Sequence, residues 1–133
     1  MTKYFNFLFL FFLPIFGYNQ NNGLISEVSI DDYFLFKLNW KSYDGQDTLY
    51  YIIYRDMRRE SNFSKIEYKG KINDFYNIFA TSLKKPVGTT VDVVFNQNEC
   101  MIMKESKNKL WINSNKTYFY LNMKYLNKLF NRK

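Results

Sequence analysis

Apolar and polar side chains alternate through residues 28–41, with the apolar ones mostly at even positions. A period of two residues is typical of a β-strand that buries one face. Asp31 and Asp32 interrupt the pattern, so this segment is either two strands or one strand with a bulge. Asp44–Gly45 predicts a tight turn. Residues 48–55, rich in tyrosine and isoleucine, would then return as the next strand and complete an N-terminal hairpin.

Residues 73–85 carry the clearest helical pattern. Their apolar residues recur at helical spacing on one side, namely Phe75, Ile78, Phe79 and Leu83. We expect Asn73 or Asp74 to cap the first turn and Pro86 to end the helix. A short second helix is expected at the C-terminus, where Asn122 would be the cap. Its apolar side would consist of Leu126, Leu129 and Phe130.

The remaining apolar stretches are short and are separated by turns that contain glycine, asparagine or serine. They predict strands at residues 65–69, 89–95, 100–103, 110–112 and 117–121. Alternatively, the terminal helix could begin at Ser114, but the aromatic run Tyr118–Tyr120 favours a strand. The predicted fold is therefore α+β: an antiparallel β-sheet (N-terminal hairpin plus C-terminal meander) with one packed helix near 73–85 and a short C-terminal helix.

The first residues form a separate, apolar segment. Lys3 is followed by an almost wholly apolar run to Gly17 and then by polar residues, an order typical of a secretory signal peptide. The run is shorter than the roughly 20 residues of a membrane-spanning helix, and Pro14 interrupts it. We expect a signal peptide at 1–19 and a single small α+β domain at 20–133, exported to the periplasm, cell surface or medium. An uncleaved anchor and an apolar first strand are the alternatives.

The chain has no histidine and a single cysteine, Cys100. This composition excludes Ser-His-Asp and Cys-His catalysis, histidine-ligated metal sites, thiolate zinc sites and iron–sulfur clusters. Carboxylate chemistry, lysine chemistry and oxygen-ligated calcium or magnesium stay open, but no motif for them is present. We predict no catalytic set, no metal site and no cofactor. A lone exposed thiol would be reactive in an oxidising compartment, so we expect Cys100 to be buried.

The formal net charge of +7 has two interpretations, ordinary solubility of a lysine-rich surface or attraction of an exported protein to anionic surfaces. The aromatic-rich hairpin lies next to clustered arginines, and an aromatic row left uncovered on it could stack on a ligand. The predicted ligand- or partner-binding residues are Tyr50, Tyr54, Arg55, Arg58 and Arg59. Expected partners are an anionic envelope component, a glycan or another envelope protein. Nucleic acid is disfavoured, because the chain carries no nucleic-acid-binding motif.

These features favour an exported, non-enzymatic binding or accessory protein of the bacterial envelope. One alternative is a small carboxylate-dependent hydrolase acting on envelope polysaccharide, which would need two carboxylates about 5 to 9.5 Å apart in one cleft. Its candidate acids are Asp31, Asp32, Asp56, Glu60, Glu67 and Glu99. A third hypothesis is a structural protein that self-associates through the edge of the aromatic hairpin.

Overall fold

The computed structural model describes residues 20–132, apart from 31–32, 44–47, 60–61 and 97. The predicted signal peptide at 1–19 and the predicted Asp44–Gly45 turn lie outside the described residues. Within the described part of the chain, neither helix has the length and apolar character that a membrane crossing requires.

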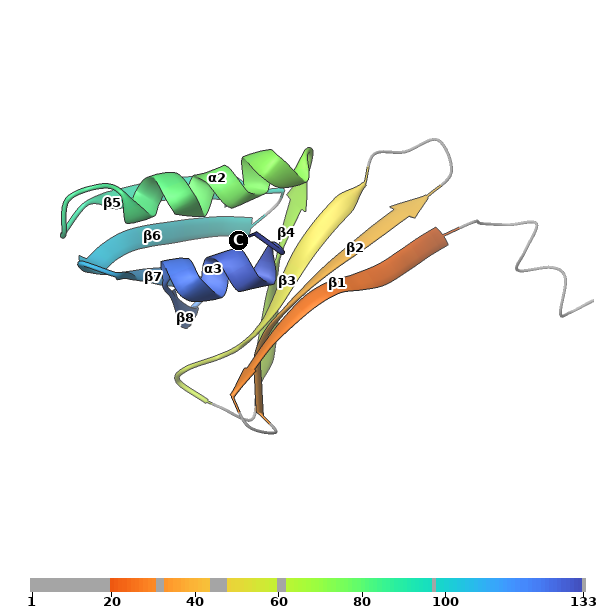
Figure 1. The fold of residues 1–133 in the computed structure, drawn as a ribbon, viewed down its shortest axis with the longest axis horizontal. Helices are drawn as coiled ribbons and strands as arrows, with labels where there is room; N and C mark the ends of the chain where they lie inside the picture. The colour runs from red at the N-terminus through yellow and green to blue at the C-terminus, as the bar shows by residue number, and fades with distance from the viewer. Residues whose placement is uncertain (1–19, 31–32, 44–47, 60–61, 97, 133) are drawn as a thin grey trace, which may run out of the picture.

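The strands form two antiparallel sheets, each with its strands in chain order (Figure 1). The first sheet contains β1 (Gln20–Ile30), β2 (Tyr33–Tyr43), β3 (Leu49–Arg55) and β4 (Phe63–Lys69). The second contains β5 (Thr90–Phe95), β6 (Asn98–Ser106), β7 (Lys109–Ser114) and β8 (Thr117–Leu121). Helix α2 (Ile72–Leu83) follows the first sheet, and helix α3 (Met123–Leu129) follows the second. Each half of the described chain is thus a four-stranded meander followed by a helix, and the α+β prediction is confirmed.

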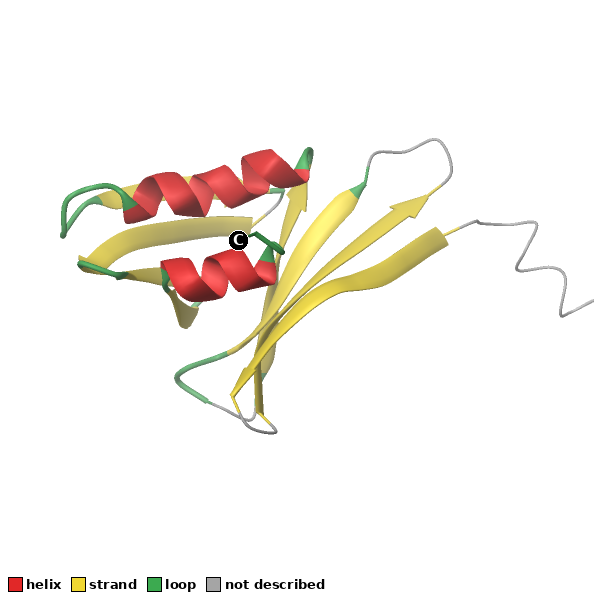
Figure 2. Ribbon diagram, in the orientation of Figure 1, coloured by secondary structure: helices red, strands yellow, loops and turns green. Residues whose placement is uncertain are grey.

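The two helices lie side by side on one side of the second sheet, and the long strands of the first sheet extend beyond them (Figure 2). Helix α2 contacts β6 and β7, and α3 contacts β1 and β2. The helices also contact each other. Together they join the two sheets into one core.

Strand β1 is longer than the pattern predicted. The segment containing Asp31 and Asp32 divides two strands that pair with each other, with Val28 opposite Phe36. The sequence pattern did not reveal its first residues because they are polar, and a register shift after Leu24, with Ile25 as the extra residue, breaks its alternation. A second shift, after Val28, places the extra residue, Leu35, on β2. Ile30, expected on the buried face, is the last residue of β1 and is 48% exposed.

Outside β3, where the face carrying Ile52 and Tyr54 is the buried one, the period-two pattern gives the correct buried face. In the first sheet the buried side chains are Val28, Phe36, Leu38, Ile52, Tyr54 and Ile66. In the second they include Phe95, Cys100, Ile102, Leu110, Ile112, Phe119 and Leu121. Cys100 is therefore buried, as predicted.

The helix boundaries are close to those predicted, but the capping differs. Helix α2 begins after Lys71, which makes no side-chain capping hydrogen bond, so the predicted Asn73 or Asp74 cap is wrong. Asp74 instead lies in the first turn, where its charge complements the helix dipole. In α3 the cap is confirmed, since the Asn122 side chain accepts a hydrogen bond from the Tyr125 N–H at 2.8 Å.

A buried polar contact connects the two sheets. The Tyr54 hydroxyl lies 2.6 Å from Thr117 Oγ1, which donates to the Ser114 carbonyl at 2.7 Å. Burial raises the pKa of Tyr54, while hydrogen bonds from neighbouring hydroxyls oppose that rise. Burial likewise raises the pKa of the Cys100 thiol. Both groups therefore hold their protons more tightly in the folded protein than in the unfolded chain.

This difference predicts a loss of stability at alkaline pH. In the unfolded chain the Cys100 thiol ionises at about pH 8.5 and the Tyr54 phenol at about pH 10. The folded protein keeps both protons to higher pH. The unfolded state is favoured once it has released them, so stability should be constant from pH 6 to 8 and fall above pH 9. Urea midpoints measured across this range should fall less steeply in Tyr54→Phe and Cys100→Ala. If the urea midpoint fell equally steeply with pH in both variants and the parent, Tyr54 and Cys100 would not be the groups responsible.

Candidate functional site

Arg58 and Arg59, two of the three arginines predicted to bind a ligand, lie in the loop after β3, which is anchored by a buried carboxylate. Asp56 is only 1% exposed. Its Oδ1 accepts from the Arg58 N–H at 3.1 Å and from the Tyr118 N–H at 3.4 Å. The Met57 N–H also donates to the Tyr118 carbonyl at 3.0 Å. These bonds fix the loop against the start of β8 and leave Arg58 and Arg59 exposed beside it.

The strand that receives this loop carries aromatic side chains on the face opposite the core. Residues alternate along β6, β7 and β8, so the side chains between the buried ones point to the other side of the sheet. All of them are partly exposed. We call this set the aromatic face: Met101, Met103, Trp111, Tyr118 and Tyr120.

Strand register places the members of the aromatic face next to one another. Trp111 pairs with Met103 on one side and with Tyr120 on the other. The Trp111 and Tyr118 ring centroids are 6.0 Å apart, and those of Tyr118 and Tyr120 are 5.8 Å apart. Lys109 Nζ lies 4.7 Å from the Tyr120 centroid. The face therefore offers aromatic surface with cations at its margin.

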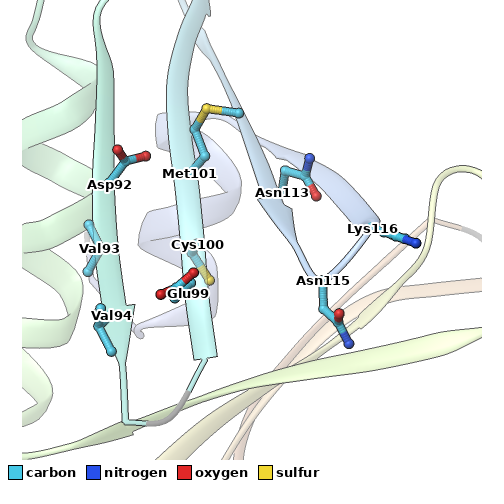
Figure 3. Close-up of a pocket in the computed structure, with 9 residues that line it drawn as sticks. All are labelled: Asp92, Val93, Val94, Glu99, Cys100, Met101, Asn113, Asn115 and Lys116. Atoms are coloured by element: carbon cyan, nitrogen blue, oxygen red, sulfur yellow. The ribbon is translucent and has the colours of Figure 1, made fainter.

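A hollow of about 510 Å³ opens beside the aromatic face (Figure 3). In Figure 3, Asp92 stands on β5, Glu99 on β6 and Asn113 on β7, with Asn115 and Lys116 on the following turn. The remaining lining residues are Val93, Val94, Cys100 and Met101.

A second hollow of about 510 Å³ shares two lining residues, Glu99 and Asn115, with the first. It extends across to Ser64 and Lys65 of β4. The strand ends meet there, because the Asn98 side-chain amide donates to the Lys65 carbonyl at 3.3 Å. The two hollows together make a polar groove that runs from the second sheet to the first, and we refer to it as the groove.

The turn at the rim of the groove has an unusual backbone. Ser114 pairs with Thr117, leaving a two-residue loop. Asn115 has φ 51° and Lys116 has φ 68°. Positive φ at both positions defines a type I′ hairpin turn, for which the second position favours glycine. A lysine there is strained, and strain of this kind concentrates at functional sites.

We expect Lys116→Gly to stabilise the protein. Glycine adopts positive φ without the steric cost of a Cβ atom. Relief of about 1 kcal/mol, less the greater entropy of an unfolded glycine, leaves a net gain of roughly 0.5 kcal/mol. Urea unfolding should show a higher midpoint, while Lys107→Gly in the preceding turn serves as the comparison. A midpoint below that of the parent would show that the lysine side chain itself contributes to stability.

The five site residues predicted from the sequence lie in different environments, some in or against the core and others on the surface. Tyr54 is fully buried, so its predicted place on an accessible surface is wrong. Tyr50 lies on the same face of β3 and packs against the core. Arg55 extends from the other face of β3, where its guanidinium lies 4.5 Å from the Phe63 ring centroid. Arg58 and Arg59 lie next to the aromatic face, in the loop whose Met57 N–H donates to the Tyr118 carbonyl.

The aromatic face was missed although the sequence contains its signal. The segments that were predicted as strands here alternate, with methionine and aromatic residues at the positions between the buried ones. The intervening residues are as regularly spaced as the buried ones, so the same alternation indicates an aromatic outer face.

Three of the candidate acids of a hydrolase lie in the described part of the chain, and each has a different setting. Asp56 holds the loop, and Glu67 pairs with Lys41 and Lys65 at 3.6 and 3.4 Å. Glu99 lines a hollow together with Asp92. Asp31, Asp32 and Glu60 lie outside the described residues. Across residues with a described placement, no three acidic or cysteine side chains gather as a metal site would require.

Comparison with known proteins found no matching family model, no matching curated protein and no matching solved structure. The function is therefore inferred from the chemistry of the aromatic face, the arginine loop and the groove.

Proposed function

We propose that this protein is an exported, non-enzymatic binding module of the bacterial envelope that captures an anionic glycan on its aromatic face. The observation that carries the proposal is a pair of hydrogen bonds, from the Met57 N–H to the Tyr118 carbonyl and from the Tyr118 N–H to the Asp56 carboxylate, which hold the loop of Arg58 and Arg59 beside that face. Export is supported by the apolar pattern of residues 1–19.

The two parts of the surface would act on different parts of the ligand. Flat aromatic rings pack against the C–H faces of sugar rings, because they combine large contact area with few rotatable bonds. Arginine binds carboxylate, phosphate or sulfate groups with paired hydrogen bonds. The formal charge of +7 would also accelerate encounter with a polyanion. An anionic glycan satisfies both chemistries, whereas a neutral polymer would leave the arginines unused.

Intrinsic tryptophan fluorescence can test this function. The chain contains two tryptophans, Trp40 and Trp111, so Trp40→Phe makes Trp111 the single reporter on the aromatic face. We expect alginate oligosaccharides to shift its emission and neutral dextran to do so more weakly. Tyr118→Ala, and separately Arg58→Ala with Arg59→Ala, should each weaken alginate binding about tenfold, equivalent to roughly 1.4 kcal/mol. Added salt should reduce the arginine contribution.

Tyr51 offers a matched control on the first sheet. It lies on the strand face opposite the core, and Lys41 Nζ and Lys65 Nζ are 5.5 and 5.6 Å from its ring centroid. Tyr51→Ala therefore removes an aromatic–cation pair away from the proposed surface and should leave alginate binding unchanged. Equal losses of alginate affinity in Tyr51→Ala and Tyr118→Ala would contradict the proposal. Affinity capture from envelope extract would also contradict it if all the captured material were destroyed by protease.

A carboxylate-dependent hydrolase is the second candidate, because Asp92 and Glu99 line one hollow. A pair of carboxylates in one cleft is what glycoside hydrolysis requires. Mass spectrometry of oligosaccharides incubated with the protein decides between the two functions. Cleavage that Glu99→Gln abolishes would favour the hydrolase, and intact oligosaccharides after prolonged incubation would favour the binding module.

A further inference from the structure

We infer that the groove binds an uncharged, hydroxyl-rich stretch of a glycan chain, with Glu99 and Asn115 at the centre of the contact. This inference rests on the proposed function, since it extends the glycan from the aromatic face into a second binding region. The groove would recognise the sugar units, while Arg58 and Arg59 would recognise the charge.

The lining of the groove fits hydroxyl groups. Carboxylates accept hydrogen bonds and side-chain amides both donate and accept them, so planar groups of these two kinds can bind pairs of neighbouring hydroxyls. The groove supplies carboxylates from Asp92 and Glu99 and amides from Asn98, Asn113 and Asn115. Each hollow of about 510 Å³ falls within the range of roughly 300–1,000 Å³ typical of small-ligand sites.

The charges along the groove favour a ligand without net charge. Asp92 and Glu99 contribute two negative charges, and Lys65 and Lys116 contribute two positive ones. An anionic group placed there would face the carboxylates, and a cationic group would face the ammonium groups. Hydroxyl groups pair with both. The charged groups of the glycan are therefore expected at Arg58 and Arg59.

The groove and the aromatic face are continuous. Asn113 lines the groove and pairs in register with Met101 on one side and with Tyr118 on the other. A chain that stacks on Tyr118 therefore meets the Asn113 amide at the next position on the sheet. Figure 3 shows Asn113 and Asn115 following one another along this strand and its turn.

The turn at Asn115 supplies a second, independent indication. Both Asn115 and Lys116 hold positive φ, and both line the first hollow. Glycine would suit the second position better, so the chain keeps a lysine side chain there despite the backbone cost. A role for that side chain at the rim of a ligand site accounts for the observation.

Isothermal titration with neutral oligosaccharides tests the inference. The probes are maltohexaose, cellohexaose and chitohexaose, which carry no charge. We expect at least one to bind, and Glu99→Ala and Asn115→Gly each to weaken it about tenfold. Asn115→Gly is suitable because glycine keeps the positive φ of the turn while removing the amide. Glu105→Ala is the matched control, since Glu105 lies on the same strand outside the groove and pairs with Lys109 at 3.9 Å.

The two proposals fail in different ways. If alginate binds through Tyr118 and Arg58 but no neutral probe binds, or Glu99→Ala binds as well as Glu105→Ala, the groove inference is overturned and the proposed function stands. If a neutral probe binds through Glu99 while alginate binds no better than dextran, the groove inference is supported and the anionic preference is overturned. If no probe of either kind binds, both are overturned. Circular dichroism and urea unfolding of each variant ensure that lost binding is measured on folded protein.

Discussion

Replacing Phe75 with alanine is expected to lower the free energy of unfolding by about 3–5 kcal/mol. Phe75 is fully buried at the point where the two halves of the described chain meet. Its ring stacks on Tyr68 of the first sheet, with centroids 4.9 Å apart, and lies 5.7 Å from Phe95 of the second sheet. Phe130, after α3, is 5.5 Å away. The truncation would therefore leave a cavity bordered by rigid rings from three parts of the chain, which cannot collapse to fill it.

Urea unfolding followed by circular dichroism measures this loss. Asn77→Ala is the comparison on the same helix, because Asn77 is exposed, and it should change stability by less than about 0.5 kcal/mol. Phe75→Leu, which keeps most of the volume, should fall between the two variants. A loss below 1 kcal/mol for Phe75→Ala would mean that the two halves do not depend on this ring for their packing.

Much of the fold could be predicted because burial in a sheet repeats locally. Ile102, Ile112 and Phe119 are each separated by one residue from another buried side chain of the same strand. Such a pattern needs no knowledge of what lies across the sheet. The same holds for the α3 cap, where Asn122 bonds to a backbone group three residues away.

The location of the site depended on long-range contacts that leave no local pattern. In β3 the two faces are almost equally apolar, so alternation could not decide which one is covered. Phe119, far along the chain, covers the face with Tyr54, at 4.3 Å between ring centroids. The arginine loop reaches Tyr118 through one hydrogen bond from the Met57 backbone and one to the Asp56 carboxylate, and neither contact leaves a local pattern in the sequence. Arg58 and Arg59 could thus be selected by charge, but not the aromatic side chains beside them.

Lys104→Met is expected to cost about 2–4 kcal/mol, because it removes hydrogen bonds to the end of a helix. Lys104 is 6% exposed on β6, and its ammonium group donates to the Leu83 carbonyl and, at 3.1 Å, to the Lys85 carbonyl. The last carbonyls of a helix lack partners within it, and the negative end of the helix dipole favours a cation there. Each carbonyl left buried without a donor costs about 1–3 kcal/mol.

An opposing effect makes this variant informative. Burying an ammonium group is itself unfavourable, and replacing a buried charge with an apolar side chain of similar length can be neutral or even stabilising. We expect the hydrogen bonds to dominate here, since methionine fills the space but donates to neither carbonyl. Urea unfolding should place Lys104→Met well below the parent, with Lys84→Met, an exposed lysine at the end of the same helix, near it. If Lys104→Met proves as stable as Lys84→Met, the free-energy cost of desolvating the ammonium group equals the stabilisation from its hydrogen bonds. In that case Lys104 would not hold this end of α2 to the second sheet.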